Sequence, residues 1–478
     1  MRDGAIGRER PTGGLVAGLA LCLSVLFGLM PARMAGAESL AETLVSAYEN
    51  SGLLEQNRAL LRAADEDAAQ ILSELRPIID WSTGISRDFR DTTTGRRSSS
   101  IEATNASAAL TLDLLLYDFG RTGLRLKAAK ETVLATRATL RSIEQQVLLR
   151  AVTAFMNVRR NRKLLAVRQS NLELLQQELR AARDRFEVGE VTRTDVALAE
   201  AQLAAARSGV ATARGELTRA IEEFRNAVGR DPGLVEAPTR LPNLSGDIEA
   251  SKRIALRNHP DMEEAQRNVA AADLTVAAAE AAMKPTVNLT TRLSADEELT
   301  GSDNATSASV GISIGGPIYQ GGRLSSLVRQ ALARRDSLRG VLHLVGLRVA
   351  QGVGDSYARL RAARASRIAG EEQVRAARVA FKGVSEEARL GARTTLDVLQ
   401  AEQDFLDAQG DLIEAEADLF IAAYSVLEAI GQLTAKDLGL GVKTYDPNAY
   451  YDLVKDAPVP ISPQGQKLDR VLRALGKN

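Results

Sequence analysis

The sequence predicts a mainly helical protein with a small β part, built as two similar halves. The segment from Asn50 to Gly229 reappears as Asn258 to Gly431, and from Tyr117 to Gly229 the copies align without a gap at an offset of 202 residues. Each copy holds a proline-free run that is long enough for a helix on the order of 100 Å. Each also holds two segments in which apolar and polar residues alternate, as they do in strands. Both halves are therefore expected to contribute to the function.

Residues 1–37 have the pattern of an export signal peptide. Basic residues precede an apolar run from Leu15 to Met30, and Ala35-Gly36-Ala37 offers a small-x-small cleavage site. An uncleaved membrane anchor is the alternative, but the run is short for a spanning helix. We expect the mature chain to begin at Glu38 and to lack cysteine, since Cys22 lies in the signal.

The charge of the chain is balanced, with 61 Lys and Arg against 61 Asp and Glu. A nearly neutral protein has no electrostatic basis for binding nucleic acid. Aromatic residues make up 4% of the chain and hydrophobic residues 45%, which is typical of long packed helices rather than of one thick globular core.

Each copy is predicted to open with a helix that ends at a proline. These helices span about 40–75 and 261–283, and Pro77 and Pro285 follow them. Proline stops a helix and favours extended chain. Two alternating segments come next in each copy, predicted as strands at about 77–90 and 103–116 and at about 285–294 and 306–316.

These four strands decide between a membrane protein and a soluble one. Segments of about ten residues with period two, joined by a polar loop, are typical of transmembrane hairpins with one face to lipid and one to water. A soluble hairpin packed on a helix gives the same pattern. Four strands cannot close a barrel, and open edges are costly in hydrocarbon. A membrane position therefore requires several chains to pool strands, and three chains would give twelve.

Long helices are predicted over 121–185 and 323–387, each followed by a turn and a shorter helix. Apolar residues recur at alternating spacings of four and three, as in helices that pack by knobs into holes. In the shorter helices, large residues alternate with alanine from Val196 to Ala227 and from Val398 to Ala429. A generic coiled-coil rod accounts for this helical pattern but not for the alternating strands.

Segments rich in proline and glycine follow each copy. They cover 230–257, between the repeats at 38–229 and 258–431, and 432–478 after the second repeat. Because they follow the shorter helices, we expect an equatorial belt partway along the rod. The tail beyond Pro458 is predicted to be flexible.

No group of residues predicts catalysis, a cofactor or a metal site. The only histidines, His259 and His343, lie in different helical contexts and have no cysteine to join them. The run from Gly315 to Arg323 superficially suggests a phosphate loop, but it lacks the Lys-Ser/Thr of that motif. We interpret it as a strand-to-helix hinge, and we expect that the protein is not an enzyme.

Two turns between helices, at 185–195 and 388–397, remain as candidate functional segments. Glycine in each can adopt the left-handed conformation that ends a helix, and a threonine can cap the next helix. The candidate caps are Thr192 or Thr194 in the first turn and Thr394 or Thr395 in the second. Helix-hairpin geometry explains part of the pattern, but these tips also lie farthest from the strands, where a tunnel would narrow.

In this order and spacing the motifs resemble those of the TolC family of outer-membrane efflux and secretion channels. The resemblance rests on the duplicated halves, on the strand exits Leu-Tyr-Asp-Phe-Gly-Arg (116–121) and Ile-Tyr-Gln-Gly-Gly-Arg (318–323), and on the turns Phe-x-x-Gly-x-x-Thr-x-Thr-Asp (186–195) and Gly-x-Arg-Thr-x-x-Asp (391–397). It implies a homotrimer in the outer membrane of a Gram-negative bacterium. A twelve-stranded β-barrel in lipid would continue as a twelve-helix periplasmic tunnel, opened when a periplasmic adaptor (membrane fusion protein) and an inner-membrane transporter dock.

The resemblance also implies roles for single residues. Thr194, Asp195 and Arg393 match a latch in which a basic residue of the second turn holds the first turn and keeps the tunnel shut. Asp397 matches an acidic position of the tunnel entrance, whereas Gln400 stands where a second carboxylate is expected, and Ala388 replaces a supporting tyrosine. The expected adaptor-contacting tip residues are Phe186, Gly189, Thr192, Leu390, Gly391 and Thr394. The expected strand-exit hinges are Tyr117, Gly120, Arg121, Tyr319, Gly322 and Arg323.

The predicted function is a passive exit duct for a type I secretion system driven by an ABC transporter. Lipidation at Cys22 is not expected, because Leu21 rather than a small residue precedes it. This unlipidated signal and the tail from Tyr445 to Tyr451 resemble those of secretion-type members of the family. An outer-membrane component of a multidrug or small-molecule efflux pump, served by an RND or other transporter, is the alternative. A periplasmic coiled-coil scaffold without lipid-facing strands is a third interpretation.

Overall fold

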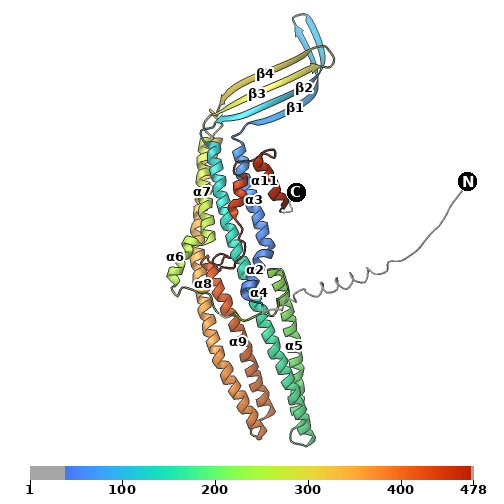
Figure 1. Cartoon of the computed structure of the whole chain (residues 1–478), viewed down its shortest axis with the longest axis vertical. Coiled ribbons are helices and arrows are strands. Elements are labelled where there is room, and N and C mark those ends of the chain that lie inside the picture. The colour runs from blue at the N-terminus through green and yellow to red at the C-terminus, as the bar shows by residue number, and fades with distance from the viewer. Residues whose placement is uncertain (1–37, 239, 475–478) are drawn as a thin grey trace, which may run out of the picture.

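The computed structural model describes residues 38–238 and 240–474. The molecule is elongated, with a four-stranded sheet at one end and two helix-hairpin tips at the other (Figure 1). The signal predicted at residues 1–37 lies outside the described residues. In chain order the elements are α2 (Leu40–Asn50), α3 (Gly52–Ser73), β1 (Ile78–Thr94), β2 (Arg97–Tyr117), α4 (Arg121–Glu187), α5 (Arg193–Val228), α6 (Ile248–Asn258), α7 (Pro260–Ala281), β3 (Thr286–Glu298), β4 (Asn304–Gly315), α8 (Arg323–Arg389), α9 (Thr395–Ala429), α10 (Pro447–Val454) and α11 (Pro463–Ala474).

Two helices of 67 residues each, α4 and α8, run from the sheet to the tips and set the length of the molecule (Figure 1). Helices α3 and α5 lie along the upper and lower parts of α4, and α7 and α9 lie in the same way along α8. The predicted mainly helical fold with two long helices is therefore confirmed. None of the helices in the described part of the chain is both long and apolar enough to cross a membrane.

The prediction of a continuous helix over 40–75 is wrong, because the chain forms two helices there. Helix α2 ends at Asn50, and the Ser51 hydroxyl accepts a hydrogen bond from the Leu54 N–H at 3.3 Å, which caps α3. The second copy has the same arrangement, since α6 precedes α7 and His259 Nδ1 caps α7. A side-chain cap satisfies free N–H groups in the first turn of a helix. The caps at Ser51 and His259 therefore allow a second helix to begin directly after the first one ends.

The four strands form one antiparallel sheet in the order β1-β2-β3-β4, and their register separates two chemically different faces. Successive side chains of a strand point to opposite faces. One face is apolar in every strand, with Ile79, Trp81, Ile85, Leu110, Leu112, Leu114, Leu289, Leu293, Val310, Ile312 and Ile314. The other face is polar, with Asp80, Ser82, Asp88, Asn105, Ser107, Thr111, Thr290, Arg292, Ser294, Ser307 and Ser309.

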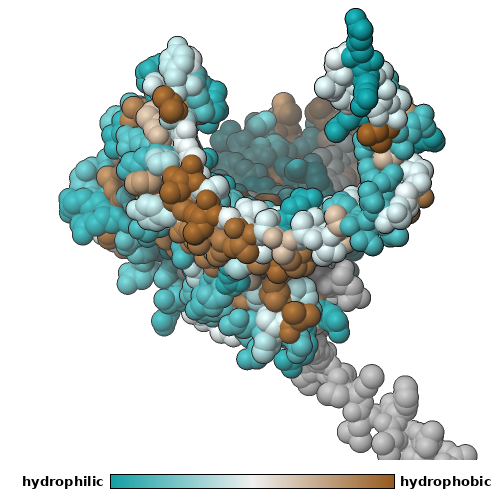
Figure 2. Space-filling model, turned by 90° about the horizontal axis from the view of Figure 1, so that it is seen from above, coloured by the Kyte–Doolittle hydropathy of each residue, from teal (hydrophilic) through white to brown (hydrophobic). Residues whose placement is uncertain are grey.

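The sheet is curved, and its two faces lie on different sides of the curve. Seen from the sheet end, hydrophobic side chains run along the outer, convex side, whereas the surface around the hollow is mostly hydrophilic (Figure 2). Strands β1 and β2 are longer than the segments predicted at 77–90 and 103–116, because pairing continues through polar residues such as Thr92 and Ser99. Those outer ends carry no apolar band.

Strands β1 and β4 form the two edges of the sheet. Within residues 38–238 and 240–474 each pairs with a single neighbour. Each edge therefore presents a row of backbone N–H and C=O groups that no described strand satisfies, which is an open site for pairing with another chain.

The main hydrophobic core lies at mid-length, where α2, α4, α5, α8 and α9 meet. Phe155 of α4 and Phe224 of α5 are fully buried there, as are Val353 of α8 and Val426 of α9. A smaller cluster nearer the tips joins Leu175 and other residues of α4 to α5 and α9. The long helices are thus held together mainly at mid-length, which leaves their ends with less buried contact.

The segments after each repeat lie at mid-length, but the C-terminal one continues beyond the belt (Figure 1). Helix α10 packs on α3, and the Tyr450 hydroxyl donates to Glu66 at 2.7 Å. Farther along, Arg76 Nη1 donates to the Ala457 carbonyl at 2.7 Å, beside the start of β1. The tail beyond Pro458, which the sequence predicts to be flexible, contains the helix α11 at Pro463–Ala474.

A buried carboxyl group lies between the lower parts of α4 and α9. The Glu402 side chain accepts a hydrogen bond from Asn171 Nδ2 at 2.6 Å, and the residue is 4% exposed. Burial, with a smaller contribution from Glu178, raises the pKa of Glu402 to about 7. A buried carboxyl that holds its proton near neutral pH makes this helix contact sensitive to pH.

We predict that a charge on the apolar face of the sheet destabilises the protein in lipid and that a charge on the polar face does not. Val310→Lys should cost roughly 2–4 kcal/mol if Val310 lies near the bilayer midplane. Ser309→Lys, on the other face of the same strand, is the matched control. The measurement is the free energy of unfolding in phospholipid vesicles, and equal losses for both variants would contradict a lipid-facing apolar side.

We also predict a pH dependence of the contact between α4 and α9. Since the pKa of Glu402 is raised in the folded state, its contribution to stability falls as pH rises from about 4.5 to about 7 and is level above that. Hydrogen exchange of Leu399–Leu406 should therefore be faster at pH 8 than at pH 5, after correction for intrinsic exchange. Glu402→Gln should remove this difference, whereas Glu414→Gln, at an exposed position of α9, should keep it.

Candidate functional site

The two helix-hairpin tips are built by matching residues in both halves. Gly189 and Gly391 have φ of 78° and 77°, in the left-handed region that glycine adopts without strain. They end α4 and α8. In the next residues Thr192 caps α5 and Thr394 caps α9, so of the alternatives predicted for each cap the structure selects these two.

Each cap is a reciprocal pair of hydrogen bonds. Asp195 accepts from the Thr192 N–H at 2.9 Å, and its own N–H donates to the Thr192 hydroxyl at 3.3 Å. Asp397 and Thr394 repeat this arrangement at 3.0 and 3.2 Å. These bonds lower the pKa of both carboxyls, that of Asp195 through the Thr192 hydroxyl and N–H and that of Asp397 through the Thr394 N–H and hydroxyl. Both aspartates are therefore ionised at neutral pH.

The predicted latch residues lie at these tips, but Arg393 binds another partner in the single chain. Its Nε donates to Glu387 Oε2 at 2.8 Å, in the last turn of α8. Asp195 bonds to Thr192, and the Thr395 hydroxyl of the other tip also lowers its pKa. Near the tips, α5 and α9 pack together through Ala199, Leu203 and Leu399. Among the described residues no ion pair joins Arg393 to Asp195. Sequence reasoning did not single out Glu387.

The expected tunnel-entrance residues lie on the first turns of α9. Asp397 is the cap residue described above, and Gln400 Nε2 donates to Asp404 Oδ1 at 2.9 Å. A carboxylate is therefore present one turn beyond the position where the sequence analysis found none. The i, i+4 spacing of Gln400 and Asp404 could have indicated this pair. Apolar side chains are exposed beside the tips, with Leu390 85% and Phe186 45% exposed.

At the opposite end of the helices, the strand exits are tight hinges. Gly120 and Gly322 have φ of 80° and 83° at the starts of α4 and α8. Asp118 accepts hydrogen bonds from the Gly120 N–H at 3.1 Å and the Thr122 N–H at 2.7 Å. Burial acts to raise the pKa of Asp118, but the hydrogen bonds from Thr122 and Gly120 outweigh it and lower the pKa.

The other predicted hinge residues surround these turns. Tyr117 and Tyr319 are exposed, and the Tyr117 ring lies 4.8 Å from that of Phe119. Arg323 donates to the Gln320 side chain at 2.6 Å, and Arg121 is exposed at the start of α4. Asp118 was not among the predicted site residues, although a short acidic side chain just before a helix can accept from its first N–H groups.

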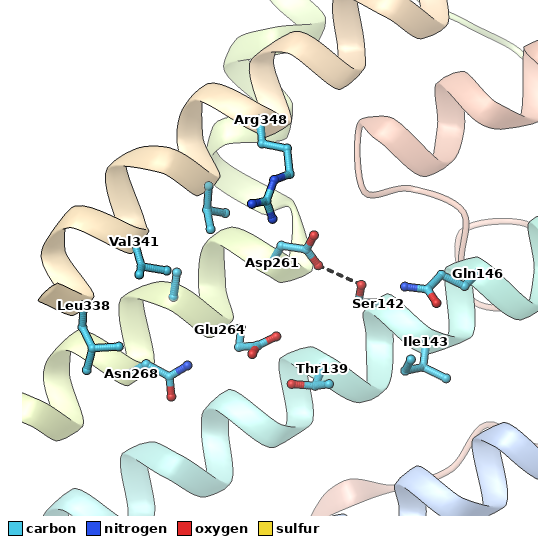
Figure 3. A pocket seen from close by; sticks show the side chains of 12 residues that line it. Thr139, Ser142, Ile143, Gln146, Asp261, Glu264, Asn268, Leu338, Val341 and Arg348 are labelled. Carbon is cyan, nitrogen blue, oxygen red and sulfur yellow. Dashed lines mark hydrogen bonds between the residues drawn. The ribbon is translucent and has the colours of Figure 1, made fainter.

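A cleft of about 340 Å³ lies between α4, α7 and α8 (Figure 3). The Ser142 hydroxyl donates to Asp261 Oδ1 at 2.8 Å, which ties the start of α7 to α4, and Arg348 points into the same space from α8 (Figure 3). The predicted site residues lie elsewhere. In residues 38–238 and 240–474 no cluster of three or more His, Cys, Asp or Glu side chains could hold a metal ion.

Comparison with known proteins identifies the family. A family model described as "Outer membrane efflux protein" matches residues 43–230 and 253–432. Outer membrane efflux protein BepC of Brucella suis biovar 1 is 36% identical over 430 residues, which cover 90% of this chain and 93% of that protein. Outer membrane protein TolC of Escherichia coli is 27% identical over 439 residues, with 87% of each covered. Alkaline protease secretion protein AprF of Pseudomonas aeruginosa is 26% identical over 376 residues, with 73% of each covered.

Solved structures agree at the level of the fold. The Campylobacter jejuni CmeC outer membrane channel superposes with a TM-score of 0.74 at 16% identity, covering 88% of this chain and 90% of that one. An identity this low carries the fold and not the function. The family match and the relative at 36% identity also support the function at a coarse level, since members of this family are channel proteins rather than enzymes. The chain belongs to the outer membrane efflux protein family and is an outer-membrane protein of a Gram-negative bacterium.

Proposed function

We propose that three copies of this chain form a passive exit duct through the outer membrane and across the periplasm. In this proposal the three sheets close into one twelve-stranded barrel, and the helices continue it as a tunnel. The observation that carries it is the register of the sheet, which places one apolar and one polar face on a curved wall with two open edges. Lipid against the convex face and water in the hollow satisfy both faces at once.

The tunnel has no chemistry of its own, so its cargo is set by the proteins that dock on it. We place a periplasmic adaptor at the exposed tip residues Phe186, Gly189, Thr192, Leu390, Gly391 and Thr394, and an inner-membrane transporter behind it. Glycine turns with flanking apolar side chains give the tips a surface that a partner helix hairpin can cover.

Type I secretion, with an ABC transporter, is the cargo class that we predicted from the sequence. Similarity to the alkaline protease secretion protein AprF supports it. Small-molecule efflux is supported by the higher identity to the efflux protein BepC.

We predict that deletion of the gene separates these two cargo classes. If the duct serves efflux, the deletion strain should become at least fourfold more sensitive to detergents, dyes and antibiotics, with an unchanged set of secreted proteins. If it serves secretion, one or more large exoproteins should disappear from the medium. A strain unchanged in both respects, with the protein normally expressed in its parent, would contradict the proposed duct.

For the gate we propose that Arg393 exchanges between two partners. Paired with Glu387 it leaves the first tip free, and paired with Thr194 and Asp195 it holds the tips together. A ligand or adaptor that favours one pairing shifts the populations of the two states. Asp397 and Gln400, with Asp404 beside them, then line the entrance.

This exchange makes opposite predictions for its two acidic partners. Asp195→Ala, or Arg393→Ser, should raise single-channel conductance in planar bilayers severalfold, because the closed pairing is lost. Glu387→Gln should lower the conductance, because Arg393 loses its alternative partner. Glu386→Gln, at the neighbouring exposed position that pairs with Arg389, is the control and should leave conductance unchanged. Lower conductance in Asp195→Ala, Glu387→Gln and Glu386→Gln alike, or unchanged conductance in all three, would count against the latch.

A further inference from the structure

A pocket of about 570 Å³ lies at mid-length beneath the segment 431–447. It is walled by α2 and α3 on one side, by α4 on another, and by the start of α7. Its α4 residues, from Leu134 to Gln145, lie on the face of the helix opposite to the cleft of Figure 3, as the helical period requires. The pocket is therefore distinct from that cleft, and it lies far along the molecule from the tips and the strand exits.

The acidic side chains that line this pocket already have partners. Glu144 accepts a hydrogen bond from the Ala435 N–H at 2.7 Å. Glu263 pairs with Arg141. Asp437 accepts from the Thr434 hydroxyl at 2.7 Å in a turn of the covering segment. The partners of these three carboxylates are residues of the pocket wall and its covering segment.

Two of the basic side chains that line it have unused donors. Arg58 and Arg137 each have a buried Nε–H without a hydrogen-bond partner among the described residues, and Lys436 lies in the same wall. The guanidinium groups are fixed by aromatic rings, with Arg58 5.3 Å from the centre of Tyr48 and Arg137 5.4 Å from that of Tyr451. Their positions are thus set without using all their donors.

Two neutral donors complete the set. The Gln145 side chain is 2% exposed, and its Nε2 lacks a hydrogen-bond partner in the described part of the chain. The buried Tyr445 hydroxyl also lacks a partner within hydrogen-bond distance there, although Arg62, Asp65 and Arg58 lie near it. Asp65, a buried carboxyl near both Arg137 and Tyr445, accepts no hydrogen bond from the described residues. A buried donor left unpaired is costly, and four of them around one pocket call for an acceptor.

We propose that this pocket binds an oxyanion, a phosphate or carboxylate group, between Arg58, Arg137, Gln145 and Tyr445. Arginine offers planar, charge-assisted hydrogen bonds that match the oxygens of either group. The chemistry is shared by free phosphate and by carboxylates on a peptide or cell-wall polymer in the periplasm. Because the covering segment supplies Tyr445, binding ties the segment 431–447 to α3 and α4.

The test is calorimetric titration of the purified full-length protein in detergent with inorganic phosphate and, separately, with succinate, at fixed chloride. Saturable binding of either probe at one site per chain supports the proposal. Binding of phosphate or of succinate then shows whether the site takes a phosphate or a carboxylate group. Arg137→Gln should weaken binding at least tenfold, about 1.4 kcal/mol. Tyr445→Phe and Gln145→Met, which keep the size of the side chain, should each weaken it at least threefold.

The matched control is Arg150→Gln on the same helix, where the arginine donates to Asn226 outside the pocket. It should leave binding unchanged. Failure of both probes to bind saturably at millimolar concentrations would overturn the proposal, as would equal affinity in the wild type and the Tyr445 and Gln145 variants. The readout needs no transport, so it is independent of the proposed duct.

Discussion

The backbone groups along β1 and β4 set the constraint from which the rest of the architecture follows. Each of these strands has one paired side and one open side in the described chain. In hydrocarbon an unpaired N–H or C=O costs several kcal/mol, and a row of them cannot be tolerated there. In the proposed duct, however, the apolar face of the same sheet lies in lipid. The two demands are met together only when the edges pair with other copies of the chain.

The two long helices, α4 and α8, begin directly after strands β2 and β4. The strands deliver the chain to α4 and α8 through the hinges at Gly120 and Gly322, and Asp118 fixes the first of these by capping α4. From there two helices of 67 residues reach the tips, held together mainly by the core around Phe155 and Phe224. A well-buried middle with exposed tips is consistent with the proposed gate, in which the tips move while the sheet does not.

Much of this fold could be predicted because its signals are local or repeated. Proline-free heptad runs gave the long helices, the period of two gave the strands, and glycine with a capping threonine gave the tips. Other features depend on partners far away in the sequence. The position of α10 and of the residues before α11 could not be read from composition, since they bond to Glu66 and Arg76, more than 300 residues earlier. The break at Ser51, by contrast, has a local signal, because Ser51 caps α3 through Leu54.

In the candidate site, too, local features could be predicted from the sequence, whereas long-range contacts could not. Capping by Thr192 and Thr394 follows from short spacing, so it was among the predicted alternatives. The partner of Arg393 did not follow, because Glu387 and Asp397 both lie near this exposed side chain, and sequence does not rank two such ion pairs. The donors of the mid-length pocket come from three separate parts of the chain, and only the folded structure collects them.

Cross-linking of the two edge strands is the most direct test of the central claim that the sheets of neighbouring copies pair. The mature chain is expected to lack cysteine, so Ser82→Cys on β1 can be combined with a single cysteine at Ser307, Ser309 or Ser313 on β4. Within one chain these edges are three strand spacings apart, roughly 14 Å, which is too far for a disulfide. The account predicts covalently linked trimers on oxidation for at least one pair, and monomers alone at every position would contradict it.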